Sequence, residues 1–277
     1  MVIHVRGVPV FYEEAGAGRP LLVLHGKPLD HHYVAADMEP LFENRAGWRR
    51  LYPDLPGMGR TPGADWIKGE DHMLEIVSGF VDAVAPGERF VAAGTSAGGY
   101  LARGLLHRRQ AQMDGLLLIV ADLPEPENGQ RPAHQVITRE PGFEATLQPD
   151  ERSLLNFLVV QDGKMLEHMR VLVNPAAAIA DHAFLEQITD GFAFDIAALD
   201  EPFLAPALMV CGRQDAGCGF HGAARLIDDC PRGTLAVLDR AGHMAPVEQS
   251  GLFRALVSEW LDRVEEYAPI RGGAFDA

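Results

Sequence analysis

The 277-residue sequence predicts an α/β fold in which a mostly parallel sheet is interrupted by a helical insertion. Short apolar runs alternate with stretches of helical period up to about residue 121, as in parallel strands joined by helical crossovers. The alternation stops at 122 and resumes near 207. We therefore expect one core domain, residues 1–121 and 201–277, with a helical lid at residues 122–200 inserted in it.

The individual elements follow from local patterns. An opening hairpin is predicted at 2–15, where apolar and polar residues alternate around a Gly-Val-Pro break. Continuous apolar runs closed by glycine, such as LLVLHG, are typical of strands buried on both faces. The further predicted strands are 21–26, 48–53, 89–94, 115–121, 207–212 and 234–238. The predicted helices are 31–44, 70–84, 97–110, 220–229 and 249–266, followed by a tail with little to bury.

Composition excludes several classes of protein. The net charge of −15 argues against nucleic-acid binding. No apolar stretch reaches 18 residues and the first residues lack a secretory pattern, so we expect a cytoplasmic protein without membrane contact. Three irregularly spaced cysteines indicate neither a disulfide framework nor a zinc site. We also expect no metal at His31 and His32, because adjacent helical side chains diverge.

The candidate nucleophile is Ser96, in the run Gly94-Thr95-Ser96-Ala97-Gly98 between a predicted strand and a predicted helix. A sharp turn there needs glycines on either side of the serine, since Cβ atoms would clash. It also exposes the hydroxyl beside a helix N-terminus, which favours developing negative charge. In this context the run predicts a nucleophile rather than a plain tight turn.

A serine nucleophile needs a base and a carboxylate that orients the base. Of eleven histidines, His243 is placed on a loop that follows a predicted strand and precedes a helix, at the sheet edge where chemistry gathers. Asp215 follows the preceding strand and is the favoured acid. Asp122, just past another strand, is the alternative. The other histidines suit surface or packing roles.

The oxyanion of an acyl transfer needs two backbone donors. Ala97, directly after the nucleophile, supplies one, and the loop His25-Gly26-Lys27-Pro28 offers the other, which we assign to the Lys27 N–H. We expect His25 to brace this loop and the Lys27 side chain to reach solvent.

Together these residues resemble the α/β-hydrolase superfamily, in its serine-nucleophile, esterase-like branch, over residues 2–266. The matching segments are His25-Gly26-Lys27-Pro28, Asp54-Leu55-Pro56-Gly57-Met58-Gly59-Arg60, Gly94–Gly99, Gly212-Arg213-Gln214-Asp215 and Gly242-His243. The resemblance implies an eight-stranded sheet, a helical cap and no cofactor. It implies that Ser96 is the nucleophile, Asp215 the acid and His243 the base. In the Asp54–Arg60 loop, we expect the glycines to serve positive φ.

The expected activity is hydrolysis of a small carboxylic ester through an acyl-enzyme, with a small-molecule substrate. Carbon–carbon bond hydrolysis of a vinylogous diketone by the same triad is an alternative, and a ligand-binding, receptor-like member of the fold is another. Apolar residues of the insertion would line an acyl pocket or pack on the sheet, and packing is favoured for each: Phe143, Leu155, Phe157, Leu158, Met165, Met169, Leu172 and Phe184. Nothing in the sequence predicts the oligomeric state.

Overall fold

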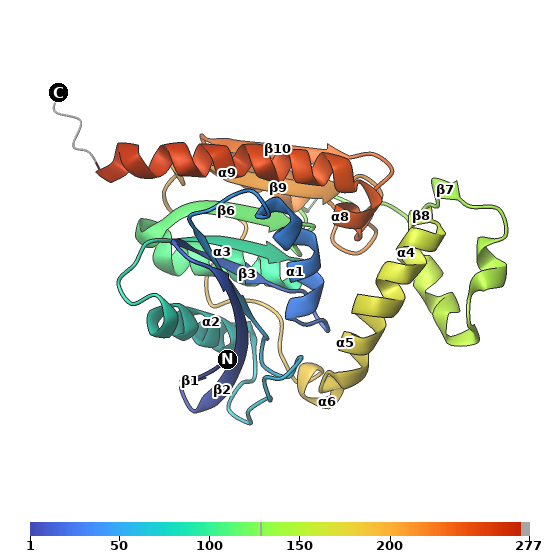
Figure 1. The fold of residues 1–277 in the computed structure, drawn as a ribbon, viewed down its shortest axis with the longest axis horizontal. Coiled ribbons are helices and arrows are strands. Elements are labelled where there is room, and N and C mark those ends of the chain that lie inside the picture. Colours follow the sequence, from blue (N-terminus) through green and yellow to red (C-terminus); the bar gives the residue numbers. More distant parts are fainter. Residues whose placement is uncertain (128, 273–277) are drawn as a thin grey trace.

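The computed structural model describes residues 1–127 and 129–272, which form a mostly parallel eight-stranded sheet with helices on both faces (Figure 1). The strand order is β1-β2-β4-β3-β5-β6-β9-β10, with β1 antiparallel to β2 and β2 antiparallel to β4. The remaining neighbours are parallel. The strands are β1 Val2–Val5, β2 Val8–Gly16, β3 Arg19–Leu24, β4 Trp48–Pro53, β5 Phe90–Thr95, β6 Met113–Ile119, β9 Ala207–Gly212 and β10 Gly233–Leu238. The predicted fold class is confirmed.

Two apolar cores, one on each face of the sheet, follow from the side-chain alternation of the buried strands. In β3, Leu22 and Leu24 join one core, whereas Leu21 and Val23 join the other. The first core is covered by α2 (Glu70–Val84), α3 (Ala97–Arg109) and α7 (His221–Leu226). The second is covered by α1 (His31–Met38) and α9 (Ser250–Gly272), with the short α8 (Ala245–Glu248) beside them. Figure 1 shows α9 and α2 on opposite sides of the sheet.

The segment between β6 and β9 projects beyond one end of the sheet (Figure 1, right). It is only partly helical, although a helical pattern is predicted for all of it. A two-stranded parallel pair, β7 (Thr138–Arg139) and β8 (Val160–Gln161), precedes three short helices. These are α4 Gly163–His168, α5 Asn174–Ile179 and α6 His182–Leu185. Prolines restrict helix length here, since each removes an amide donor and restricts the residue before it.

Strands β3 and β6 begin and end two residues earlier than predicted, and the largest differences in element ends lie at a proline or near the chain end. Helix α1 stops at Met38 and a 3₁₀ turn containing Pro40 replaces its predicted second half. Helix α8 is missed by the prediction, and α9 runs to Gly272, so it includes half of the predicted loose tail. The rest of that tail, residues 273–277, lies outside the described residues.

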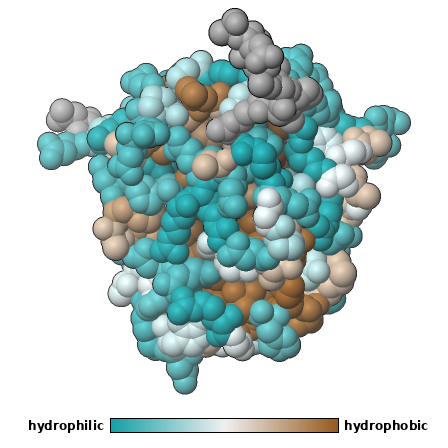
Figure 2. Space-filling view, turned by 90° about the vertical axis from the view of Figure 1, so that its left-hand side faces the viewer, coloured by the Kyte–Doolittle hydropathy of each residue, from teal (hydrophilic) through white to brown (hydrophobic). Residues whose placement is uncertain are grey.

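The surface opposite the inserted segment is mostly hydrophilic, with a limited brown area near its lower edge (Figure 2). Within residues 1–127 and 129–272, no helix is long and apolar enough to cross a membrane.

Candidate active site

Ser96 lies at the junction of β5 and α3 with φ +54°, a backbone conformation that non-glycine residues rarely adopt. The Ser96 N–H donates to the Ile119 carbonyl at 3.0 Å, and the Ser96 carbonyl accepts from Tyr100 N–H at 3.0 Å. These bonds hold the turn between strand and helix. A strained residue held in place by its surroundings is typical of functional sites.

The two glycines of the turn are required by close backbone approach. A Cβ on Gly94 would overlap the Gly98 carbonyl, and a Cβ on Gly98 would overlap the carbonyl oxygens of Leu24 and His25. The same packing brings the loop after β3 against the serine, because a Cβ on Gly26 would lie 3.1 Å from the Ser96 Cβ.

His243 and Asp215 are brought together from the loops after β10 and β9. The His243 Nδ1 lies 3.0 Å from Asp215 Oδ2. Asp215 is fully buried, and its Oδ1 accepts from the N–H groups of Gly217 (2.8 Å) and Cys218 (3.0 Å). The alternative acid, Asp122, instead pairs with Arg131 at 3.0 Å.

The contact with Asp215 favours the tautomer of His243 that carries its proton on Nδ1. The Asp215 carboxylate can only accept, so the His243 Nδ1 donates and Nε2 faces the other way. Burial lowers the pKa of His243, but hydrogen bonds with Asp215 and Cys218 outweigh burial and raise that pKa above its ordinary value. The surroundings therefore stabilise the imidazolium form.

Ser96 and His243 line the same cavity, of about 260 Å³, together with Gly26 and Lys27. Within the described residues the two side chains are not hydrogen-bonded to each other; such bonds often form only in the substrate complex. The remaining lining side chains are mostly apolar: Pro28, Leu29, Tyr33, Phe157, Met169, Val173 and Met244. Of the predicted insertion residues, Phe157 and Met169 line this cavity, whereas Phe143, Leu158 and Met165 are buried in the second core.

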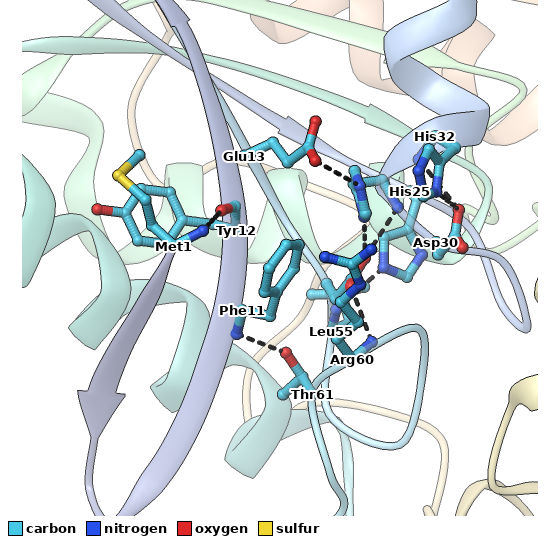
Figure 3. Close-up of polar contacts among 12 residues, drawn as sticks. Met1, Phe11, Tyr12, Glu13, His25, Asp30, His32, Leu55, Arg60 and Thr61 are labelled. Atoms are coloured by element: carbon cyan, nitrogen blue, oxygen red, sulfur yellow. Dashed lines mark hydrogen bonds and ion pairs between the residues drawn. The ribbon is translucent and has the colours of Figure 1, made fainter.

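The backbone donors predicted for an oxyanion lie next to the serine. In the described part of the chain, neither the Ala97 N–H nor the Lys27 N–H donates to another backbone or side-chain group. His25 braces the loop as predicted, since its Nε2 accepts from Leu55 N–H at 2.9 Å (Figure 3) and its Nδ1 lies 2.9 Å from the Gly26 carbonyl oxygen. The Lys27 ammonium, expected in solvent, donates to the Leu185 carbonyl at 2.9 Å.

A second cavity, of about 340 Å³, opens beside Ala97 and is lined by the carboxylates Glu70, Asp122 and Asp190. Arg131 is its cationic lining residue. Burial and the neighbouring Asp190 raise the pKa of Glu70 to about 7. Because Arg131 pairs with Asp122, the net negative charge of this cavity comes from Glu70 and Asp190.

Two residues near His243 are missed by the sequence prediction. Cys218 is buried, and a ligand atom of each of Asp215, Cys218 and His243 lies within 4.8 Å of the others. Glu248 accepts from Gly242 N–H at 2.6 Å and from Val159 N–H at 2.9 Å, so it joins the His243 loop to the insertion. For Glu248, the sequence indicates only that the residue lies five positions after His243, on the helix that follows the His243 loop.

The expectation that His31 and His32 diverge is wrong. Their ring centroids are 3.9 Å apart, because His31 is the first residue of α1 and its ring is drawn to Asp54. The positive φ predicted for the loop glycines is confirmed at Gly57 (+77°) and Gly59 (+55°).

Residues 21–256 match a family model described as "Alpha/beta hydrolase family". The chain belongs to the alpha/beta hydrolase family. An α/β-hydrolase-superfamily structure from Oenococcus oeni covers 96% of this chain and 99% of its own, with TM-score 0.84 and 24% identity.

Relatives of this alpha/beta hydrolase with functional names fall into two kinds. A 2-hydroxy-6-oxononadienedioate/2-hydroxy-6-oxononatrienedioate hydrolase of Burkholderia vietnamiensis is 25% identical, over 92% of this chain and 91% of its own. A pimeloyl-[acyl-carrier protein] methyl ester esterase of Legionella pneumophila is 22% identical, over 91% of this chain and 99% of its own. The relatives thus include an ester hydrolase and a hydrolase named for oxo-dioic acids.

Proposed function

We propose that this alpha/beta hydrolase is a serine hydrolase that cleaves small carboxylic esters with an apolar acyl group. The observation that carries the proposal is the strained Ser96 sharing one cavity with His243, whose Nδ1 is bonded to the buried Asp215. A nucleophile, a base and an orienting carboxylate are what acyl transfer through a serine requires.

The proposed reaction has two halves. His243 Nε2 takes the Ser96 proton while Oγ attacks the ester carbonyl, and the N–H groups of Ala97 and Lys27 hold the oxyanion. The leaving alcohol then takes the proton from His243, which leaves an acyl-enzyme. Water attacks this ester with the same histidine as base, and Ser96 is released with the carboxylic acid.

The two cavities favour an ester over the dioic acids for which one relative is named. The cavity beside Ser96 is mostly apolar and about 260 Å³ in volume, which suits a small acyl group. The cavity beside Ala97 carries Glu70 and Asp190 in addition to the ion pair of Asp122 with Arg131, so its net charge is negative and disfavours a second carboxylate on the substrate. We therefore rank carbon–carbon bond hydrolysis of a vinylogous diketone second, and a binding-only role third.

Release of p-nitrophenol from short acyl esters tests the proposal. We expect turnover by the parent chain and a loss of at least about a thousandfold in Ser96→Ala. Ser78→Ala is the matched control, because Ser78 lies on α2 and bonds Arg109 away from the cavity. Unchanged turnover in Ser96→Ala would contradict the serine mechanism.

A second assay separates the alternatives. A fluorophosphonate probe should label Ser96, and absence of the adduct would favour the binding-only role. Faster cleavage of a vinylogous diketone than of any ester in the panel would favour the carbon–carbon reaction.

A further inference from the structure

The helical part of the insertion contains a π-turn. Helix α4 runs into the π-turn Met169–Val173 and then into α5, and Figure 1 shows α4 and α5 following one another. The Asn174 N–H donates to the Met169 carbonyl, which is the i→i+5 bond of a π-turn. Pro175 cannot supply the α-helical bond to the Val171 carbonyl, so the regular pattern is interrupted here. Single π-turns inside α-helices are frequent at functional sites.

The two ends of the π-turn face the candidate catalytic cavity, and its middle faces solvent. Met169 and Val173 line the cavity that contains Ser96 and His243. Met169 is 2% exposed, and Val173 is partly buried against the second core. Val171, midway between them, is 56% exposed. The π-turn therefore forms one wall of the cavity with the side chains at its ends.

Contacts on both sides hold this wall in place. Tyr33 of α1 and Met244 line the opposite side of the cavity, and the Tyr33 hydroxyl donates to the Met244 sulfur at 3.3 Å. The ring of His168, directly before the π-turn, lies edge-on to the Tyr33 ring with the centroids 5.3 Å apart. Arg170 of the π-turn pairs with the buried Glu151 at 2.6 Å. The space between the walls is therefore set by the side chains of the π-turn.

The insertion residues that line the cavity differ in how they can affect a bound chain. Phe157 is 55% exposed, so its ring can turn towards solvent when a longer substrate enters. Met169 is buried in the second core, where a change of size would disturb packing. Val173 combines a fixed position with a short, branched side chain that has few rotamers.

We propose that Val173 limits the length of the linear acyl group that fits beside Ser96. The inference rests on the proposed ester hydrolysis and names its substrate class, esters of short linear carboxylic acids. A cavity of about 260 Å³ leaves little room for a larger side chain at position 173 together with the same acyl group.

Substitutions of opposite effect at Val173 test the proposal. We would measure kcat/KM on p-nitrophenyl esters with linear acyl groups from acetyl to decanoyl, for the parent chain, Val173→Phe and Val173→Ala. Each value is divided by that of the same protein on the acetyl ester, so a general loss of activity cancels. We expect the hexanoyl-to-acetyl ratio to fall at least about tenfold in Val173→Phe, and the decanoyl-to-acetyl ratio to rise in Val173→Ala.

Val171→Phe is the matched control, because it places the same side chain on the exposed middle of the same π-turn. Its ratios should equal those of the parent chain. Parent-like ratios in Val173→Phe would overturn the proposal, and so would an equal fall in Val171→Phe. A parent chain that hydrolyses none of the esters would contradict the proposed function, and this inference with it.

Labelling of Ser96 provides a readout that needs no turnover. The rate with a long-alkyl fluorophosphonate, divided by the rate with a short-alkyl one, should fall in Val173→Phe and stay unchanged in Val171→Phe. Val173→Leu adds only one methylene and serves if phenylalanine disturbs the fold; it should lower both kinds of ratio in the same direction. An unchanged ratio in a folded Val173→Leu would contradict the proposal.

Discussion

At the scale of single residues, the turn at Ser96 requires glycine at positions 94 and 98, where a Cβ atom would overlap neighbouring backbone. Its positive φ is tolerated because Gly94 and Gly98 let β5, α3 and the loop after β3 approach one another without Cβ atoms. The strain is therefore held by surrounding backbone rather than by a particular side-chain contact.

Adding one methyl group at Gly98 should disturb this turn. A Cβ there would overlap the carbonyl oxygens of Leu24 and His25, so we expect Gly98→Ala to lower the free energy of unfolding by about 1–3 kcal/mol. Gly251→Ala is the control, because Gly251 lies in α9 with open space around its Cβ direction. Urea unfolding of both variants is the measurement. Equal stability of Gly98→Ala and the parent chain would show that the backbone relaxes freely.

The choice between the two acids can be tested directly. In Asp215→Asn the His243 Nδ1 loses its carboxylate acceptor, and we expect kcat on an active ester to fall by about 10⁴. Asp122→Asn should change kcat by less than about tenfold, because Asp122 pairs with Arg131 and not with His243. The reverse order of effects would identify Asp122 as the acid.

Residues at strand ends are predictable from sequence, whereas contacts between distant loops are not. Ser96, Asp215 and His243 stand out because each follows an apolar run in a sheet whose carboxyl ends share one edge. The bond between His31 and Asp54 joins residues 23 positions apart on a helix and a loop, and no local pattern marks it. The role of Glu248 likewise depends on a distant contact, because it accepts hydrogen bonds from the N–H groups of residues 159 and 160 in the insertion.

At the scale of elements, the insertion is the part that sequence describes least well. The core strand β9 coincides with its predicted range, since its sequence ALMVCG is a continuous apolar run. Between β6 and β9, short helices, 3₁₀ turns and the β7–β8 pair follow from tertiary contacts that periodicity does not report. Phe157 lines the cavity although its helical spacing favoured packing.

The hydrogen bonds by which Glu248 joins this insertion to the His243 loop should contribute to stability and activity. Removing the Glu248 carboxylate leaves the N–H groups of Gly242, Val159 and Val160 without their acceptor. We expect Glu248→Ala to cost about 1–3 kcal/mol of unfolding free energy and to lower kcat/KM. Glu259→Ala, which removes only an exposed pair with Arg263, is the control and should change both little. Equal effects of the two substitutions would refute the link.

At the scale of the whole molecule, the two apolar cores share one sheet, so the helices on its two faces are packed onto the same strands. The pKa of Asp37, in α1, depends on burial and on cationic side chains from two other helices. Burial raises the pKa of Asp37 to about 7, although Arg254 of α9 and Lys164 of α4 act in the opposite direction.

Global stability should therefore carry a pH dependence from this one carboxyl. The folded state holds the Asp37 proton more tightly than the unfolded state, so its contribution favours folding at low pH and is lost as the pH rises towards 7. We expect the stability of Asp37→Asn relative to the parent chain to be greater at pH 8 than at pH 5, because only the parent chain loses the Asp37 contribution as the pH rises. Thermal unfolding of both proteins at pH 5 and at pH 8 checks this. A difference in Tm between variant and parent that is the same at both pH values would contradict it.

The hydrogen bonds from residues 159 and 160 to Glu248 come from main-chain amides, which every amino acid except proline provides. Substitutions at the nearby Phe157, which lines the cavity, can therefore alter a side chain that meets a substrate while the attachment to the His243 loop is inherited unchanged. At positions 159 and 160 themselves proline would remove an attaching bond, and at the buried Val159 packing also restricts the side chain.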